Sequence, residues 1–351
     1  MRLIKRLSGF LTIISIFTSL SACTTNVNTG KYTKDIKDIR IGVTLYKQED
    51  AFIDSITKNI DKIAKEKESE GKYKITINVV DAKGSANNQS NQVDKFISQG
   101  YDIICVNLVD RTAASVIIDK AKSANIPVIF FNREPVEEDM ERWNKLYYVG
   151  ALAEQSGEMQ ANIIINAYNK DVKKVDKNGD GKIQYVMLEG EPGHQDTLIR
   201  TEYCVKTITK SGIELEKLAD DTANWQYAQA TTRMTQWIQT FGDKIEVVLC
   251  NNDDMALGAI RALDNLNITK NRPLIVGIDG MPDALTAVKN GTMSGTIINN
   301  SYKQAKAIFD IGYTLATHGN VSLIEGLERE KYIKTSHTEV TSDNVDKYLE
   351  K

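Results

Sequence analysis

Polar and aromatic side chains follow the ends of several short apolar runs in this sequence. The runs read as strands, and in open parallel sheets ligands bind beyond the carboxyl ends of the strands. The side chains are therefore expected to meet at one site. The set comprises Asp50, Phe52, Asn107, His194, Asp196, Arg200, Trp225, Asn252, Asp279 and Asn299.

This set suits a neutral ligand covered with hydroxyl groups. Its carboxylates, carboxamides, one Arg and one His are nearly balanced between acceptors and donors, and charged groups make the stronger hydrogen bonds. The flat rings of Phe52 and Trp225 can cover the C–H faces of a sugar ring. Neither glycine-containing segment, 179–181 or 190–193, matches a nucleotide phosphate loop.

Each residue of the set also has a purely structural reading. Asp50 could cap a helix, Asn107 could close a turn, and Trp225 could belong to the core. Their shared position at strand ends, together with two aromatic rings, favours a binding site.

A second pattern predicts a cation site. Residues 176–181 read D-x-N-x-D-G, the start of a calcium loop, with oxygens at positions one, three and five and a glycine turn at six. Position seven (Lys182) supplies a carbonyl and position nine is Gln184, but position twelve is Met187 rather than Glu. The last ligand must therefore come from elsewhere in the chain. We expect a structural calcium ion, and a plain Asn/Asp/Gly turn is the alternative.

The elements that position these residues alternate between strand and helix. Such alternation predicts βαβ units and parallel sheets, and ten strands suit two sheets of five or six better than one. Several of the runs are almost wholly apolar, as strands covered on both faces must be. The predicted strands are 41–45, 75–80, 103–108, 128–131, 146–149, 183–188, 213–218, 247–250, 274–278 and 296–298.

The N-terminus predicts export and lipid anchoring. Residues 1–22 combine a basic start with an uncharged stretch, which is typical of a signal peptide. The Leu-Ser-Ala that precedes Cys23 resembles the lipobox of bacterial lipoproteins, which would make Cys23 the lipidated first residue of a tether over 23–38. A retained anchor helix is the alternative. Cys105, Cys204 and Cys250 have no C-x-x-C spacing, and we expect them to be buried thiols.

Composition excludes several classes of protein. The 351 residues carry 44 Lys and Arg against 47 Asp and Glu, a net charge of −3. Three of the cations lie in residues 1–22, so the rest of the chain carries 41 against 47, a net −6. An acidic balance argues against a general nucleic-acid binder. The hydrophobic share of 41% and charged share of 26% argue against disorder and against a polytopic membrane protein.

Over residues 39–345 the sequence resembles the galactose/glucose-binding branch of the type I periplasmic binding proteins. The resemblance is carried by the segments 40–47, 50–52, 104–110, 130–135, 190–196, 251–253 and 277–279. It implies that the ten polar and aromatic residues named above bind a hexose, with Phe52 and Trp225 on its two faces. It also implies that Glu246 completes a calcium site with Asp176, Asn178, Asp180, Lys182 and Gln184. Gln48 stands where that branch often has an aromatic residue, which leaves sugar preference open.

The resemblance further implies two doubly wound parallel-sheet lobes joined by a three-strand hinge. The N-terminal lobe would span 39–150 plus 300–332, and the C-terminal lobe 151–299 plus 333–351. A ligand that touches both lobes would favour the closed state, which a membrane partner can recognise.

The expected function is capture of D-glucose or D-galactose by a monomeric, extracytoplasmic lipoprotein that delivers the sugar to an ABC permease. One alternative is a sensor subunit that presents the sugar to a chemoreceptor or histidine kinase. Another is a secreted carbohydrate-active enzyme, which would need a fixed carboxylate separation and one raised pKa. A sugar-responsive repressor would need a DNA-binding segment, whereas the N-terminus is predicted to be a signal peptide.

Overall fold

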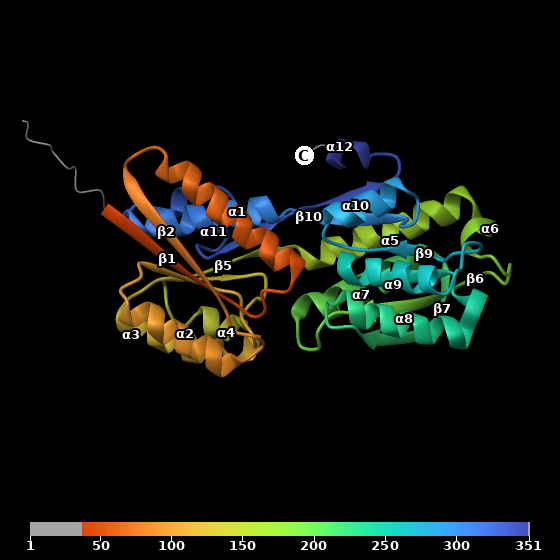
Figure 1. Ribbon diagram of the computed structural model, residues 1–351, viewed down its shortest axis with the longest axis horizontal. Helices are drawn as coiled ribbons and strands as arrows, with labels where there is room; N and C mark the ends of the chain where they lie inside the picture. Colours follow the sequence, from red (N-terminus) through yellow and green to blue (C-terminus); the bar gives the residue numbers. More distant parts are fainter. Residues whose placement is uncertain (1–36, 350–351) are drawn as a thin grey trace, which may run out of the picture. The chain divides into compact units, whose positions relative to one another are not determined.

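The computed structural model describes residues 37–349 (Figure 1). The predicted signal peptide, Cys23 and the tether up to residue 36 lie outside the described residues, as do residues 350–351. Each predicted strand is present; the strands at 128–131 and 247–250 have the predicted ends, and the other eight have shifted ends. The strands are β1 (Lys37–Leu45), β2 (Tyr73–Asp81), β3 (Ile103–Val106), β4 (Val128–Phe131), β5 (Leu146–Ala151), β6 (Lys182–Glu189), β7 (Glu214–Thr222), β8 (Val247–Cys250), β9 (Leu274–Val276), β10 (Gly295–Asn299), β11 (Tyr332–Thr335) and β12 (His337–Thr341).

Helices alternate with the strands as the pattern predicted. The long helices have apolar faces that are buried and polar faces that are exposed. They are α1 (Ala51–Glu68), α2 (Ala86–Ser98), α3 (Ala114–Ala124), α5 (Ala153–Lys170), α7 (Gln195–Lys210), α8 (Tyr227–Phe241), α9 (Asp253–Asn265), α10 (Pro282–Lys289) and α11 (Ser301–Ala316). The short helices are α4 (Glu137–Met140), α6 (Val172–Val175) and α12 (Asp346–Leu349).

The strands form two six-stranded sheets. The first has the order β11-β5-β4-β3-β1-β2 and the second β12-β10-β9-β8-β6-β7. We call each sheet with its helices a lobe. The central strands β3, β4 and β8 are buried along their whole length, which explains why they are continuous apolar runs. The predicted fold class, two doubly wound α/β lobes, is confirmed.

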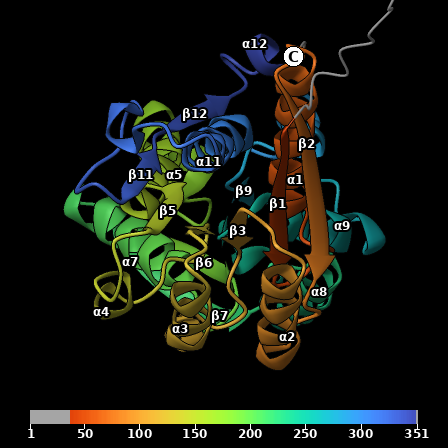
Figure 2. The ribbon, with the colours of Figure 1, turned by 90° about the vertical axis from the view of Figure 1, so that its left-hand side faces the viewer.

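Helices cover both faces of each sheet. In the first lobe α1 and α11 pack on one face and α2 and α3 on the other (Figures 1 and 2). The contact between α1 and α11 joins segments some 240 residues apart, as in the hydrogen bond from Asn59 to Ser301. In the second lobe α5 and α7 cover one face and α8, α9 and α10 the other.

The chain crosses between the lobes three times, after β5, after β10 and after β11.

Two strands near the end of the chain, β11 and β12, were not predicted. β11 pairs with β5 in the first lobe, so the last crossing lies at residue 336 and not at the expected boundary of 332/333. β12 pairs antiparallel with β10, which corrects the expectation of a wholly parallel second sheet. β1 begins at Lys37, inside the predicted tether.

Cys105, Cys204 and Cys250 are free and buried, as predicted. Among residues 37–349, no helix is both long and apolar enough to cross a membrane.

Candidate functional site

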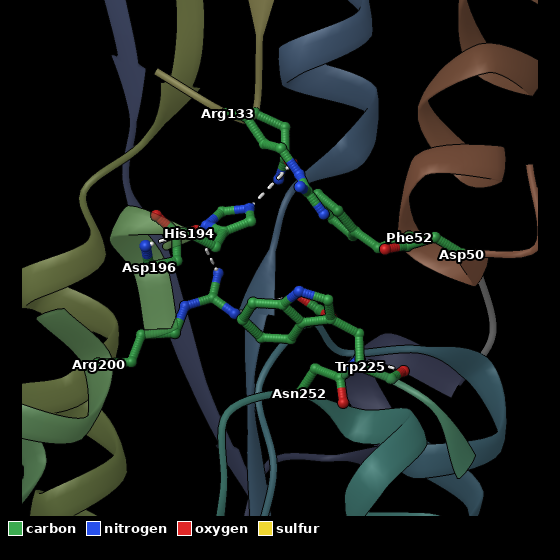
Figure 3. A pocket seen from close by; sticks show the side chains of 10 residues that line it. Asp50, Phe52, Arg133, His194, Asp196, Arg200, Trp225 and Asn252 are labelled. Carbon is green, nitrogen blue, oxygen red and sulfur yellow. Dashed lines mark hydrogen bonds and ion pairs between the residues drawn. The ribbon is translucent and has the colours of Figure 1, made fainter. Parts of the chain in front are cut away.

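A pocket lies between the two lobes, where the carboxyl ends of the strands meet (Figure 3). Eight of the ten predicted residues line it. α1 brings two of them, while the others come from the second lobe. Asn132 and Arg133, which directly follow β4, complete the wall. The predicted lining residues are Asp50, Phe52, His194, Asp196, Arg200, Trp225, Asn252 and Asp279.

Three of these residues are also helix caps. The side chains of Asp50, His194 and Asn252 accept hydrogen bonds from backbone N–H groups at the starts of α1, α7 and α9. Capping and pocket lining are therefore not alternatives here, because a strand that ends at the pocket is followed by a helix that begins there. Each cap fixes the position of its own side chain at the pocket wall.

Arg200 lies between two carboxylates. Its Nη2 is 3.0 Å from Asp196 Oδ2 and its Nη1 is 4.0 Å from Asp279 Oδ1. Burial raises the pKa of Asp196 and of Asp279, and the guanidinium of Arg200 opposes that rise in both. The group as a whole supplies a fork of donors beside carboxylate acceptors.

His194 is neutral and its tautomer follows from its contacts. Its Nδ1 accepts a hydrogen bond from the backbone N–H of Asp196 at 3.1 Å, which leaves the proton on Nε2. Nε2 faces Oδ1 of Asn132 at 3.4 Å, across the gap between the lobes. Burial and the charges of Arg133 and Arg200 hold the pKa of His194 well below its usual range.

Trp225 occupies a strained position in the pocket. Its φ of 64° lies in the left-handed region, which is uncommon for a bulky residue and is concentrated at functional sites. Its ring packs so closely on Gly190 that a Cβ there would lie 2.1 Å from the indole. The indole Nε1 is buried and has no hydrogen-bond partner among the described residues. An orphaned donor in a polar pocket favours a ligand acceptor at that point.

The cavity left between these side chains is small. Its volume is about 20 Å³, enough for about one water molecule. Asp196, Arg200 and Trp225 are each less than a tenth exposed. The lobes or the lining side chains must therefore move apart before a larger ligand enters.

Asn107 and Asn299 lie behind the pocket wall. The amide of Asn107 donates to the Phe131 carbonyl and to Asn132 Oδ1, both at 3.2 Å. Asn299 accepts from Gln304 Nε2 at 2.6 Å, and its Nδ2 is 3.5 Å from Asp279 Oδ1. In this conformation the two residues hold lining groups in place. Asn132 and Arg133 directly follow the predicted strand 128–131, but the predicted site did not include them.

The D-x-N-x-D-G loop lies at the opposite end of β6 from the pocket. The oxygens of Asp176 accept from the N–H groups of Gly179 and Gly181, and Asp180 Oδ1 accepts from Lys182. The amide of Gln184 donates to Asp180 and also to Glu216, a residue that sequence reasoning missed.

Glu246 joins this loop from just before β8. It is 1% exposed, and its carboxylate accepts from the N–H groups of Lys177, Asn178 and Gln184. The donor set is all oxygen, which suits calcium chemically. As arranged here, however, these oxygens bind the loop's own backbone. Within residues 37–349, no three or more His, Cys, Asp or Glu side chains lie in position to hold a metal ion.

Comparison with known proteins identifies the family to which this chain belongs. Residues 41–320 match a family model described as a periplasmic binding protein domain. The chain belongs to this family. The two-lobed fold of this chain is similar to that of an ABC transporter solute-binding protein from Bacillus halodurans with bound myo-inositol. That structure superposes with a TM-score of 0.73 at 27% identity, covering 91% of this chain and 99% of the other.

Curated relatives of the chain are named for sugars and polyols. The D-galactose/methyl-galactoside binding periplasmic protein of Haemophilus influenzae is 38% identical over 316 residues, covering 89% of this chain and 92% of that protein. A xylitol-binding protein of Mycolicibacterium smegmatis is 30% identical over 315 residues, covering 89% and 79% of the two chains.

Proposed function

We propose that this periplasmic binding protein captures D-glucose or D-galactose between its lobes and delivers the sugar to an ABC transporter. The observation that carries the proposal is the pocket itself. It combines carboxylates, amides, a neutral His and an Arg fork with the rings of Phe52 and Trp225. A pyranose needs both kinds of surface, since its hydroxyls donate and accept and its faces are apolar. The galactose-binding relative from Haemophilus influenzae supports the choice of hexose.

Binding is coupled to lobe closure in this proposal. Asp50, Phe52 and Arg133 face the site from the first lobe, while α7 and the loops after β7, β8 and β9 face it from the second. A sugar that contacts both sides stabilises the closed state by contacts that the open state lacks. The three crossings between the lobes would serve as the hinge.

Calorimetry with a panel of sugars tests the proposal. We expect D-glucose or D-galactose to bind with micromolar or tighter affinity and to change the emission of Trp225, with ribose, xylitol and myo-inositol as comparison ligands. Heat from none of the hexoses, or tighter binding of a pentose or polyol, would contradict it.

The same proposal includes a place in the cell. The sequence before residue 37 supports export and lipid attachment at Cys23, which would tether the lobes at the outer face of the membrane. Metabolic labelling with palmitate tests this, because label should be lost from a Cys23→Ala chain and kept in a Cys105→Ala chain.

A role in transport rather than catalysis fits the pocket chemistry. A glycosidase needs one carboxyl that donates a proton and a second that attacks or activates water. Here Asp196 and Asp279 share one Arg200, which suits fixed acceptors. The relatives compared above are binding proteins. Absence of sugar release from an aryl galactoside would agree with this role.

We also propose a calcium ion at the D-x-N-x-D-G loop. The side chains of Asp176, Asn178, Asp180, Gln184 and Glu246, with the Lys182 carbonyl, would hold it. Support comes from the oxygen-only donor set and from the burial of the Glu246 carboxylate beside the loop. Calcium would replace several of the backbone N–H groups as the partner of these oxygens. Calcium titration of chelator-treated protein, followed by calorimetry, tests the site.

A further inference from the structure

Glu191 of the second lobe binds two cations of the first lobe. Its Oε1 accepts a hydrogen bond from Lys47 Nζ and its Oε2 one from Arg133 Nη2, each at 2.6 Å. Lys47 follows β1 and Arg133 follows β4, whereas Glu191 follows β6. One carboxylate therefore bridges two cations across the gap between the lobes. Charge-assisted bonds of this length are about twice as strong as neutral ones.

Glu191 and Arg133 are each anchored within their own lobe, and Lys47 follows β1 of the first lobe. The loop of Glu191 is held where Gly190 N–H donates to Asn251 Oδ1 at 3.0 Å and Thr197 Oγ1 donates to the Glu191 carbonyl at 3.0 Å. Arg133 Nη1 donates to the Val109 carbonyl at 3.1 Å. Because the anchors lie in different lobes, both ion pairs break when the lobes separate. The pairs therefore stabilise the closed state alone, which is the condition for shifting an equilibrium.

The bridge continues into the pocket through Arg133. This side chain lines the pocket, is 7% exposed, and lies with its guanidinium carbon 3.7 Å from the ring centre of Tyr46. The hydroxyl of Tyr46 in turn donates to Asp50 Oδ2 at 2.6 Å. Burial by itself would raise the pKa of Glu191, but Arg133 and Lys47 lower it overall, so the carboxylate is charged at neutral pH.

We infer that Glu191 is the latch of the closed state: its ion pairs with Lys47 and Arg133 hold the lobes together and slow the release of bound ligand. The identity of the released ligand rests on the proposed function, whereas the ion pairs between the lobes do not depend on it. Glu191 is a positioning residue, since it acts on the pocket through Arg133 and Tyr46. Because these ion pairs exist only while the lobes are closed, they must break before a bound ligand can leave, so their loss should raise the dissociation rate.

Three substitutions separate the latch from an ordinary ion pair. Glu191→Gln keeps the shape and removes the charge, and Lys47→Gln removes one of the two partners. Glu134→Gln is the matched control, because Glu134 pairs with Lys334 at 3.1 Å with similar exposure and both lie in the first lobe.

The first measurement is hydrogen exchange of the full-length chain without sugar. In Glu191→Gln we expect amides on both sides of the gap, in 46–50 and 190–197, to exchange about tenfold faster, while Glu134→Gln changes only its own surroundings. Lys47→Gln should show a smaller effect in the same direction. Unchanged exchange at 46–50 and 190–197 in both Glu191→Gln and Lys47→Gln would overturn the latch.

The second measurement is the dissociation rate of D-galactose or D-glucose, followed by Trp emission in a stopped-flow instrument. We expect Glu191→Gln to release the sugar about tenfold faster, Lys47→Gln about threefold faster, and Glu134→Gln at the wild-type rate. Added salt should speed release from the wild type and have less effect on Glu191→Gln. Equal release rates in all four proteins would overturn the latch. Wild-type protein that binds neither hexose would contradict the proposed function, and the exchange data would still decide on the latch.

Discussion

The pocket and the D-x-N-x-D-G loop are both rich in polar oxygens, but they use them differently. In the loop, the carboxylates of Asp176, Asp180 and Glu246 accept hydrogen bonds from nearby backbone N–H groups. In the pocket, Trp225 Nε1 and Arg200 Nε are buried without a partner among the described residues. The loop is contiguous apart from Glu246, whereas the pocket is assembled from both lobes.

The two regions differ in how much they would gain from a ligand. A buried donor without a partner costs free energy, and a ligand that accepts a hydrogen bond from it would remove that cost. The loop satisfies most of its groups by itself and gains from a cation only by exchanging partners. Changes in the pocket should therefore affect binding first, and changes in the loop should affect stability first.

Trp225→Ala is expected to have the largest effect on binding. It removes an aromatic face and the orphaned indole donor, so hexose affinity should fall by at least about a hundredfold. The ring also belongs to the buried apolar core of the second lobe, so the melting temperature should fall as well, and binding is therefore measured at a temperature where the variant is folded. Calorimetry measures the loss, and Trp225→Phe should recover part of it. Wild-type affinity in Trp225→Ala would remove the pocket from consideration as the binding site.

Arg200→Met should weaken both binding and stability. It leaves Asp196 and Asp279 buried without their shared cation, which costs about 3–5 kcal/mol of unfolding free energy. Denaturant unfolding measures the change. Arg142→Met is the control, because Arg142 pairs with Asp119 at the surface, where an ion pair contributes little to stability. Equal losses in the two variants would show that Arg200 is not organising the pocket.

Glu246→Gln should lower stability and leave sugar affinity nearly unchanged. The buried carboxylate accepts three backbone N–H groups, and the amide can accept at only one of its two ends, so we expect a loss of about 1–3 kcal/mol. If calcium occupies the loop, a chelator should lower the melting temperature of the wild type but not of Glu246→Gln. A chelator effect of the same size in both would place the metal elsewhere.

Substitution of Asp254 is expected to have the smallest effect, a change in stability that depends on pH. Burial, with Asp50 and Asp283 nearby, raises its pKa to about 6. An acid whose pKa is raised on folding destabilises the folded state when it is charged, and that cost fades as the pH falls from 6 toward 4. Asp254→Asn should therefore gain about 1–2 kcal/mol at pH 7 and almost nothing at pH 4. Thermal melts across this range test the prediction, and a gain that does not vary with pH would refute it.

Strand and helix positions were predictable because buried parallel strands are short apolar runs and their helices have a clear period. β11 and β12 escaped prediction because Tyr332–Thr335 and His337–Thr341 are edge strands with alternating exposure and contain Lys334, His337 and Glu339. Edge strands lack the continuous apolar pattern of central ones. Their membership of different sheets depends on pairing with β5 and β10, which local sequence does not encode.

Most of the pocket lining was predictable because nearly all of its residues follow a strand or lie in the first turns of a helix. The positions of Asn107 and Asn299 behind the wall were not, since residues at the same strand ends differ only in side-chain direction. The bridge from Glu191 to Lys47 and Arg133 also escaped prediction. Its members are about 60 and 140 residues apart in the chain, and only the approach of the two lobes brings their charges together.

The pairing of β11 and β12 has a consequence for synthesis. Residues 332–341 supply the last edge strand of both sheets, and α11 completes the core of the first lobe shortly before them. Neither lobe can finish folding until nearly the whole chain has been made. Domains usually fold in order as the chain emerges, but here the first lobe must wait for the second. A protein with this order of assembly stays incompletely folded through most of its translation, a state that would suit the export proposed above.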